Sequence, residues 1–404
     1  RCAAGVRMLD CDSDAAIALA VPALAEAERA GDAPSIVELL IIIGSAMLNS
    51  GRHEDGIASM ERGLALAQRL GNDRLTGLAL TNLGAGCGEA LSLDAAERYL
   101  QRGTEFCAER DLDAQRLYQR AWLALVRLAQ GRWDEASAAA HEVIGERRAT
   151  TVARVMALIA LGRLRARRGD PGVWQALDEA RDIAAGTATL QRLAPMRAAR
   201  AEAAWLEGRN DDARREAEAA LPLGLAKKHP RFAAELLLWC RRTGASAEIP
   251  AFFAGHPFAL EAAGRWQEAA QAWRALGCPF EAARALADGD EPAQREALAA
   301  LESLGARPMV ERVRQRLRAA GARGLPRGPR ASTRQHPAGL TGTEVAVLAL
   351  LAAGLRNKQI AHRLARSPRT IDHHLEAIFA KLGVVTRAEA VSAAFKAGIV
   401  QPPR

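Results

Sequence analysis

A short phrase that recurs along much of the chain is the feature that most constrains its fold. The phrase begins with glycine and places an acidic residue and an alanine shortly afterwards; its clearest copies start at Gly131, Gly208 and Gly264. With weaker copies at Gly51, Ser92 and Gly169 included, the starts from residue 51 to residue 208 follow one another at intervals of 38–41 residues, which is typical of stacked helical hairpins. Each copy predicts a turn between antiparallel helices, in which glycine ends one helix in a left-handed conformation and the acidic residue lies near the positive dipole end of the next.

The segments between these turns have the apolar periodicity of helices. Leu117, Ala121, Leu125 and Leu128, for example, share one helical face. Alanine and leucine dominate, and only 4% of the residues are aromatic, a composition that favours helices over strands. Small residues recur where neighbouring helices would approach each other closely. They are Gly44, Gly84, Ala121, Gly162 and Ala203.

These features are similar to tetratricopeptide-type (TPR) repeats, although the period exceeds the usual ~34 residues. We therefore expect an all-α fold, with a TPR-like helical-hairpin solenoid over residues 1–320. Solenoids present extended concave surfaces, so we expect this region to sense an effector, either a small molecule or a protein. Its tryptophans could form an aromatic ligand cage. A wedge between helices is the favoured interpretation, because Trp133 and Trp266 hold the same place in their repeats.

Features that the sequence lacks argue against several classes of protein. The longest uncharged stretches, such as residues 39–50, are shorter than the ~18–20 apolar residues that cross a bilayer, and no signal peptide is visible. We therefore expect a cytoplasmic protein without a membrane partner. The six cysteines contain no C-x-x-C pair, and no His/Cys group has metal-ligand spacing, which argues against disulfides or a zinc site. Without a phosphate loop or a nucleophile elbow, we expect neither an enzyme nor a cofactor.

Positive charge is concentrated at the carboxyl end. Residues 321–404 carry 13 lysines and arginines against four acidic residues, a net charge of +9; the whole chain carries +8, so the part before residue 321 carries −1. This segregation indicates that the end of the chain meets a polyanion, although a basic tail that aids solubility would have the same composition. Residues 321–339, rich in glycine, proline and arginine, predict a basic linker.

The segment that follows this linker, from Leu340 to the end of the chain, predicts four short helices. Thr341 and Glu344 form a capping box that opens the first helix, and Gly354 ends it. Asn357 is expected to cap the second helix, over residues 358–365, whose apolar side chains face inward.

The third of these helices is the longest. Ser367 is its expected N-cap, proline occupies the first helical position, and the helix runs to Leu382. A second capping box, formed by Thr386 and Glu389, begins the fourth helix. The second and third helices, joined by a tight turn, make a helix-turn-helix module.

Two faces of the third helix differ in character when residues are placed at ~100° intervals. The core stripe is apolar and consists of Ile371, Leu375, Ile378 and Leu382. The opposite face contains Arg369, His373, Glu376 and Ala380, with Asp372 on one flank. Polar groups near the N-terminal end, with a small residue behind them, form the layout that a helix needs to enter the major groove of DNA.

Many positions of this module carry a family pattern. They are Leu340, Thr341, Glu344, Val347, Leu348, Leu351, Gly354, Asn357, Lys358, Ile360, Ala361, Leu364, Ser367, Thr370, Ile371, His374, Ile378, Lys381, Leu382, Gly383, Val384, Arg387 and Ala390. With these residues the module resembles the C-terminal DNA-binding domain of LuxR-type transcriptional regulators. The order of repeats, linker and module looks like the C-terminal portion of the large, MalT-like, ATP-binding LuxR regulators. There an ATPase module precedes the repeats; no G-x-x-x-x-G-K-[ST] occurs here, so we expect that module to be absent from this chain.

The resemblance implies a four-helix LuxR-type helix-turn-helix domain at residues 340–404, with double-stranded DNA as its partner. It places Asp372, His373 and Glu376 against the bases. The expected phosphate contacts, which give affinity without sequence information, are Lys358, Arg366, Arg369, Thr370 and Lys381. A homodimer on DNA is implied, with the last helix, residues 387–397, as its contact. RNA polymerase is a further candidate partner.

Three positions depart from the family pattern. Thr343 replaces the usual arginine before Glu344, which removes an expected ion pair. Asp372 replaces a lysine, and Glu376 occupies a second position that is basic in the family. Carboxylates there would favour the amino groups of cytosines and would weaken general affinity for DNA. A solvated helix face is an equally good interpretation of Glu376.

The main alternative to a DNA-binding regulator is a repeat scaffold whose terminal domain binds protein. A scaffold predicts an affinity for DNA no higher than that of any basic chain, whereas a regulator selects a sequence.

Overall fold

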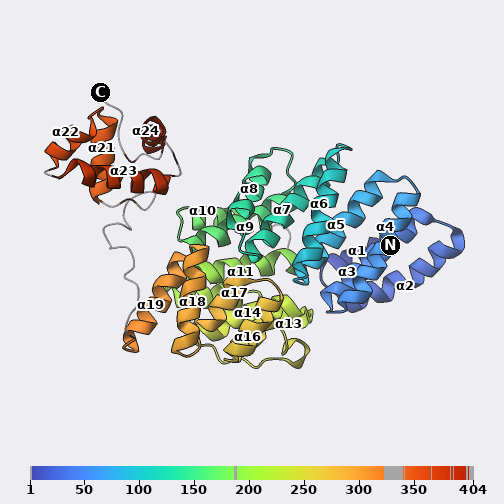
Figure 1. The fold of residues 1–404 in the computed structure, drawn as a ribbon. Coiled ribbons are helices and arrows are strands. Elements are labelled where there is room, and N and C mark those ends of the chain that lie inside the picture. Colours follow the sequence, from blue (N-terminus) through green and yellow to red (C-terminus); the bar gives the residue numbers. More distant parts are fainter. Residues whose placement is uncertain are drawn as a thin grey trace. The chain divides into compact units, whose positions relative to one another are not determined.

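Two compact units, Arg1–Ala322 and Arg323–Arg404, make up the chain in the computed structural model (Figure 1). The structure describes residues 2–185, 189–322, 340, 342–364, 366–382, 384, 386–396 and 399. Within these ranges the regular elements are helices, and no strand occurs, which confirms the expected all-α fold. None of the helices in these ranges combines the length and the apolar character that a bilayer-spanning segment needs. The predicted linker after residue 322 and the Thr341 cap lie outside the described residues.

The first unit is built from successive antiparallel helices. They are α1 (Cys2–Leu9), α2 (Ser13–Ala30), α3 (Ala33–Asn49), α4 (His53–Arg69), α5 (Asp73–Glu89), α6 (Leu93–Ala108), α7 (Asp113–Ala129), α8 (Trp133–Gly145), α9 (Thr151–Arg168), α10 (Val173–Ala185), α11 (Leu190–Leu206), α12 (Asn210–Glu218), α13 (Leu221–Ala226), α14 (Pro230–Arg242), the 3₁₀ helix η1 (Ala251–Phe253), α15 (Pro257–Ala262), α16 (Trp266–Ala275), α17 (Pro279–Leu286), α18 (Glu291–Leu304) and α19 (Arg307–Ala319).

Glycine in a left-handed conformation ends helices at the predicted turns. The φ angle is +77° at Gly131, +81° at Gly208 and +75° at Gly264. The chain also turns between copies of the phrase, for example at Gly71 (φ +63°), between the copies at Gly51 and Ser92, and at Asp111 (φ +55°), between those at Ser92 and Gly131. The recurring phrase thus marks alternate turns, and the turns between its copies lack it.

The arginine of the recurring phrase has a structural role that the sequence did not reveal. Arg132 is the N-cap residue of α8, and its guanidinium lies 2.6 Å from the carboxylate of Glu135. The same pairing over three residues joins Arg209 to Asp212 at 2.8 Å. Exposed pairs of this kind stabilise a helix start by only about 0.3–0.5 kcal/mol. Their repetition nevertheless explains why arginine follows glycine in the phrase.

Close helix packing depends on the small residues that the sequence singled out. A Cβ atom on Gly44 of α3 would come within 2.5 Å of the backbone oxygen of Gly56 in α4. Gly84 and Gly162 are likewise covered by leucine side chains of the following helix. A larger residue at Gly44 would have to move backbone, which explains the requirement for glycine there.

Most of the tryptophans pack between helices. Trp133, Trp205, Trp239 and Trp273 are buried, and the ring centroids of Trp205 and Trp239 lie 5.5 Å apart. This arrangement matches the wedge interpretation at these positions.

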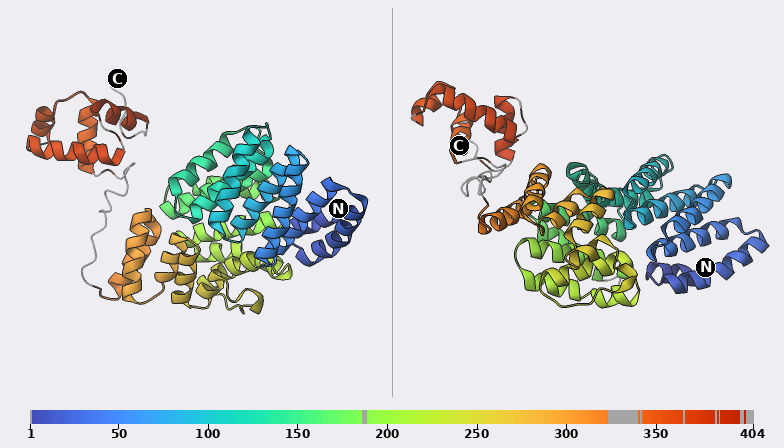
Figure 2. Two further views of the ribbon diagram at one scale, coloured as in Figure 1. Left: turned by 45° about the vertical axis from the view of Figure 1, so that its right-hand side comes forward. Right: turned by 60° about the horizontal axis from the view of Figure 1, so that its bottom comes forward.

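The array curls so that late helices return to early ones (Figures 1 and 2). The ammonium of Lys227, after α13, lies 2.6 Å from the carboxylate of Asp10, after α1. Arg231 of α14 donates hydrogen bonds of 3.0 and 2.9 Å to the backbone oxygens of Gly88 and Glu89 in α5. Segments that are far apart along the chain are thus joined directly.

A buried ionic network joins the central helices of the unit. Arg167 of α9 is 2% exposed and lies 2.7 Å from Glu202 of α11 and 2.7 Å from Glu281 of α17. Nearby, Arg284 of α17 pairs with Glu261 of α15 at 2.7 Å. Each buried charge therefore has a counter-charge on a different helix, as burial of ions requires.

The described residues of the second unit form four short helices around one apolar core. They are α21 (Gly342–Ala352), α22 (Asn357–Arg363), α23 (Pro368–Leu382) and α24 (Arg387–Lys396). Every helix contributes to the core, whose fully or almost fully buried side chains include Leu348, Ile360, Ile371, Ile378 and Ala390.

Candidate nucleic-acid interface

The start of α23 is fixed by its N-cap. The hydroxyl of Ser367 accepts a hydrogen bond of 3.1 Å from the backbone N–H of Thr370, as predicted for an N-cap. The two hydroxyl groups of these residues also lie 2.8 Å apart. The helix then runs from Pro368 to Leu382, as expected. This cap satisfies one of the free backbone N–H groups in the first turn of α23.

One face of α23 is buried and the other is open to solvent. Ile371, Leu375 and Ile378 are buried in the core of the unit, as the helical periodicity predicted. On the opposite face Arg369, Asp372, His373 and Glu376 are exposed. The predicted base-contacting residues thus share an accessible ridge near the N-terminal half of the helix.

His373 and Glu376 lie close to each other on this ridge. The Nδ1 atom of His373 lies 3.5 Å from a carboxylate oxygen of Glu376, one turn away. Their side chains remain 68% and 77% exposed, so both can reach a partner that approaches this ridge.

Asn357 connects three helices, which corrects its expected role. We predicted that it caps the second helix, but it is the first residue of α22, and Arg356 occupies the N-cap position. The amide of Asn357 donates a 2.8 Å hydrogen bond to Asp372 of α23 and accepts one of 3.1 Å from Arg387 of α24. Gln359 takes over part of the capping, since its side chain accepts from the backbone N–H of Arg356 at 2.8 Å.

This bridge sets the position of Asp372. Because its carboxylate accepts from Asn357, Asp372 can read a base only through its remaining lone pairs or after releasing that amide. Arg387, which also donates to the backbone oxygen of Leu355, was not among the expected site residues. Its position in the family pattern was the signal that could have identified it.

The expected phosphate contacts fall into two groups. Lys358, Arg366 and Arg369 are exposed. Thr370 is half-buried beside Ser367, and the ammonium of Lys381 lies 2.6 Å from a carboxylate oxygen of Glu344. The first group is therefore directly accessible to a phosphate backbone, whereas the second is also engaged within the unit.

The comparison with known families agrees with this geometry. Residues 338–394 match the model of the bacterial regulatory proteins of the luxR family. Residues 338–394 form a LuxR-type domain.

Curated relatives of the LuxR-type domain are named as transcriptional regulators. The HTH-type transcriptional regulator Rv0890c of Mycobacterium tuberculosis H37Rv is 43% identical over 72 residues, which are 18% of this chain and 8% of the relative. The transcriptional regulatory protein YdfI of Bacillus subtilis is 46% identical over 61 residues, 15% of this chain and 29% of the relative. The DNA-binding transcriptional activator DevR/DosR of M. tuberculosis is 38% identical over 74 residues, 18% of this chain and 34% of the relative. The chain thus spans from less than a tenth to about a third of these relatives.

A solved circular tandem repeat protein aligns with 96% of this chain and 79% of its own length, at 16% identity and a TM-score of 0.19. A likeness at that level supports no inference.

Lys381 is an ion-pair partner of Glu344, at the start of the LuxR-type domain. Glu344 is 4% exposed, and the ammonium of Lys381 contacts its carboxylate oxygens at 2.6 and 2.8 Å. Glu344 of α21 is therefore paired with a residue of α23. This ion pair connects the end of α23 to the start of α21.

Lys381→Met should destabilise the LuxR-type domain, because it removes the counter-charge of a nearly buried carboxylate while keeping the apolar stem. The side chain of Lys381 is 34% exposed, so we expect a loss of about 1–3 kcal/mol, below the full cost of breaking a buried pair. Hydrogen exchange of α21 and α23 in the whole chain measures it. Lys358→Met, at an exposed position, is the control and should leave exchange unchanged. If Lys381→Met and Lys358→Met show the same protection from hydrogen exchange, the structural role of Lys381 is contradicted.

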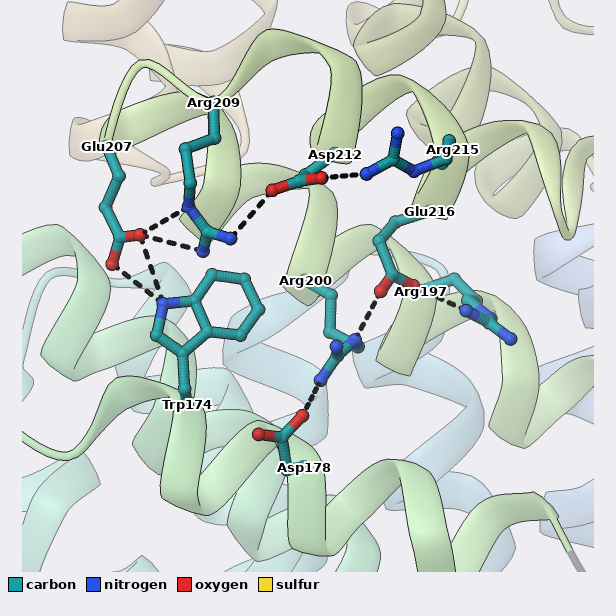
Figure 3. A pocket seen from close by; sticks show the side chains of 9 residues that line it. All are labelled: Trp174, Asp178, Arg197, Arg200, Glu207, Arg209, Asp212, Arg215 and Glu216. Carbon is teal, nitrogen blue, oxygen red and sulfur yellow. Dashed lines mark hydrogen bonds and ion pairs between the residues drawn. The ribbon is translucent and has the colours of Figure 1, made fainter.

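A charged pocket in the repeat region is a second candidate site (Figure 3). Its volume is about 720 Å³. The indole of Trp174 donates a 2.9 Å hydrogen bond to Glu207, and the guanidinium of Arg209 lies 4.2 Å from the ring centroid. Arg200 pairs with Asp178 at 2.7 Å and with Glu216 at 2.6 Å. These charged side chains pair with one another, and their ion pairs account for the charged character of the pocket.

Proposed function

We propose that this protein is a DNA-binding transcriptional regulator. Its LuxR-type domain places α23 in the major groove, where Asp372, His373 and Glu376 face the bases. The phosphate contacts come from Lys358, Arg366, Arg369, Thr370 and Lys381. The helical repeats act as the sensor region that controls this domain.

The exposed ridge of α23 is the observation that carries this proposal. Asp372, His373 and Glu376 are exposed together on the N-terminal half of α23. The other face of this helix is buried in the core of the unit. The net charge of +9 after residue 320 supports approach to a polyanion.

Further parts of the proposal concern partners and location. We place the protein in the cytoplasm, as a homodimer on DNA that pairs through α24, with RNA polymerase as a further partner. An effector, either a small molecule or a protein, acts at the repeats.

Selection of bound sequences from random duplex DNA at about 150 mM salt tests the proposal, because non-specific phosphate binding is weak there. We expect enrichment of a shared half-site, repeated as a pseudo-palindrome with centres about 10 base pairs, or a multiple of that, apart. Failure to enrich any sequence over many rounds would favour the scaffold alternative.

Arg369→Ala should weaken binding to the selected duplex and flatten the plot of log affinity against log salt by about one unit, because one phosphate contact is lost. Fluorescence anisotropy over a salt series measures both quantities. Arg62→Ala, an exposed arginine of α4, makes the same change in charge outside the LuxR-type domain and should alter neither. An unchanged slope and affinity for Arg369→Ala would remove this residue from the interface.

A further inference from the structure

A pocket of about 500 Å³ lies within the repeat region and is formed by the odd-numbered helices. Side chains of α1, α3, α5, α7, α9 and α11 line it, whereas the alternate helices of the same hairpins do not contribute. Its apolar wall includes Leu9, Ile41, Ile42, Leu78, Ala85 and Val152. An apolar pocket of this size with a few polar groups is the usual form of a small-molecule site.

The lining of the pocket includes a buried carboxylate. Glu89 is 7% exposed, and its Oε1 atom has no hydrogen-bond partner among the described residues. The nearest basic ring atom, Nε2 of His229, lies 3.7 Å away, beyond hydrogen-bond distance. A buried polar atom without a partner costs free energy, and such an atom in a folded protein calls for an explanation.

A donor without an acceptor lines the same pocket. The Nε atom of Arg192, on α11, is buried and likewise lacks a hydrogen-bond partner in the described part of the chain. Glu89 and Arg192 both line this pocket, so the two unsatisfied groups face the same space. A ligand group that both donates and accepts hydrogen bonds would satisfy both.

The local charges argue for a ligand without net charge. A ligand ammonium would be attracted by Glu89 but repelled by Arg192, and the reverse holds for a ligand carboxylate, so neither charge gains a clear advantage from this pair. The other carboxylate of the lining, Glu38, pairs with Arg74 at 2.9 Å. Burial, opposed by Arg231 and Gln191, raises the pKa of Glu89 to about 7, so this carboxylate itself is only partly ionised at neutral pH. Burial also lowers the pKa of His229 to about 3, which makes this histidine a neutral neighbour.

We propose that this pocket binds an uncharged small organic molecule that combines an apolar body with a hydroxyl or amide group. The apolar body packs against α3 and α5, and the polar group lies between Glu89 and Arg192. A regulatory role for this ligand rests on the sensor function that we proposed above for the repeats.

Three compounds with one skeleton test the proposed ligand class: phenylbutanol, phenylbutylamine and phenylbutyrate. We expect saturable binding of phenylbutanol to the whole chain, with an affinity at least about tenfold higher than that of either charged compound. Ligand-observed NMR titrations at neutral pH measure the three affinities.

Substitutions inside and outside the pocket locate the binding. Ala114→Trp adds a bulky side chain at an exposed position of the pocket lining and should abolish phenylbutanol binding; Ala108→Trp, exposed on α6, is the matched control and should preserve it. Glu89→Leu should lower the affinity about tenfold, because the acceptor for the ligand hydroxyl is lost. Glu105→Leu, exposed on α6, should not. Circular dichroism confirms that each variant is folded.

The proposal is overturned if phenylbutanol does not bind the unsubstituted chain, if all three compounds bind equally, or if both pocket substitutions leave binding unchanged. None of these assays contains DNA. If the chain binds phenylbutanol but selects no duplex sequence, the proposed ligand site stands and the proposed regulator function is contradicted. If it selects a duplex sequence but does not bind phenylbutanol, the regulator function stands and the ligand site is contradicted.

Discussion

Replacing Arg167 with methionine should lower the free energy of unfolding of the repeat region by about 3–5 kcal/mol, because the substitution leaves two buried carboxylates without their shared counter-charge. Arg167 lies 2.7 Å from both Glu202 and Glu281, which belong to different helices. Methionine retains most of the apolar stem of arginine. The decrease in the free energy of unfolding therefore measures the contribution of the charge and its hydrogen bonds. Tryptophan fluorescence during denaturation measures it selectively, since all seven tryptophans lie before residue 274.

The neighbouring residue provides a control for this experiment. Arg168 pairs with Asp134, whose side chain is 93% exposed, and surface pairs of this kind contribute about 0–1 kcal/mol. Arg168→Met should therefore change stability little. A similar small effect for both variants would mean that the network around Arg167 is not a major source of stability.

The same network predicts how acid affects the repeat region. Burial by itself would raise the pKa of Glu202, but Arg167 and Arg163 outweigh it, and the pKa is lowered. A carboxylate with a depressed pKa in the folded state stabilises the protein above its unfolded-state pKa of about 4.3, and this contribution is lost as the pH falls towards the folded-state value. We expect the unsubstituted chain to lose stability below about pH 4 and Arg167→Met to lose less over that range.

Glu376→Gln should change the base that the LuxR-type domain prefers at one position of its half-site from cytosine to adenine. Glutamate accepts from the amino group of cytosine, whereas glutamine pairs with adenine through two hydrogen bonds. The expected discrimination is about 1–3 kcal/mol, or roughly 5- to 150-fold in relative affinity. Repeating the selection from random duplexes with the variant, and then measuring single-base substitutions, tests this switch.

A matched substitution separates base reading from a general change in charge. Glu105→Gln removes the same charge from an exposed position of α6 and should leave the selected sequence unchanged. If Glu376→Gln selects the same half-site as the unsubstituted protein, Glu376 belongs to a solvated helix face, and the base contacts lie elsewhere on the ridge.

Local sequence signals predicted the LuxR-type domain well. The bounds of α23 and its Ser367 cap follow from side chains close together in the sequence, as does the capping box in which Thr386 and Glu389 bond reciprocally at 3.1 and 3.2 Å. The predicted burial of Ile371 and Ile378 rests on helical periodicity alone, and it is confirmed.

Contacts between distant segments were missed for a physical reason. Arg167 and Glu281 are 114 residues apart, and each is one of many charged residues on helices whose partners the sequence does not specify. The bridge of Asn357 to Asp372 and Arg387 escaped notice because asparagine before a helix is normally a cap. The pocket around Glu89 depends on how six helices curve together, which no periodicity encodes.

The return of α13 and α14 to the first hairpins changes how the repeat region is expected to lose its structure. An open solenoid can fray from either end, because each repeat touches only its neighbours. Here the Lys227–Asp10 pair and the hydrogen bonds from Arg231 to α5 tie the beginning of the array to its later part. Melting of the first hairpins therefore requires the release of α13 and α14 as well, so that the array should unfold as a single cooperative block.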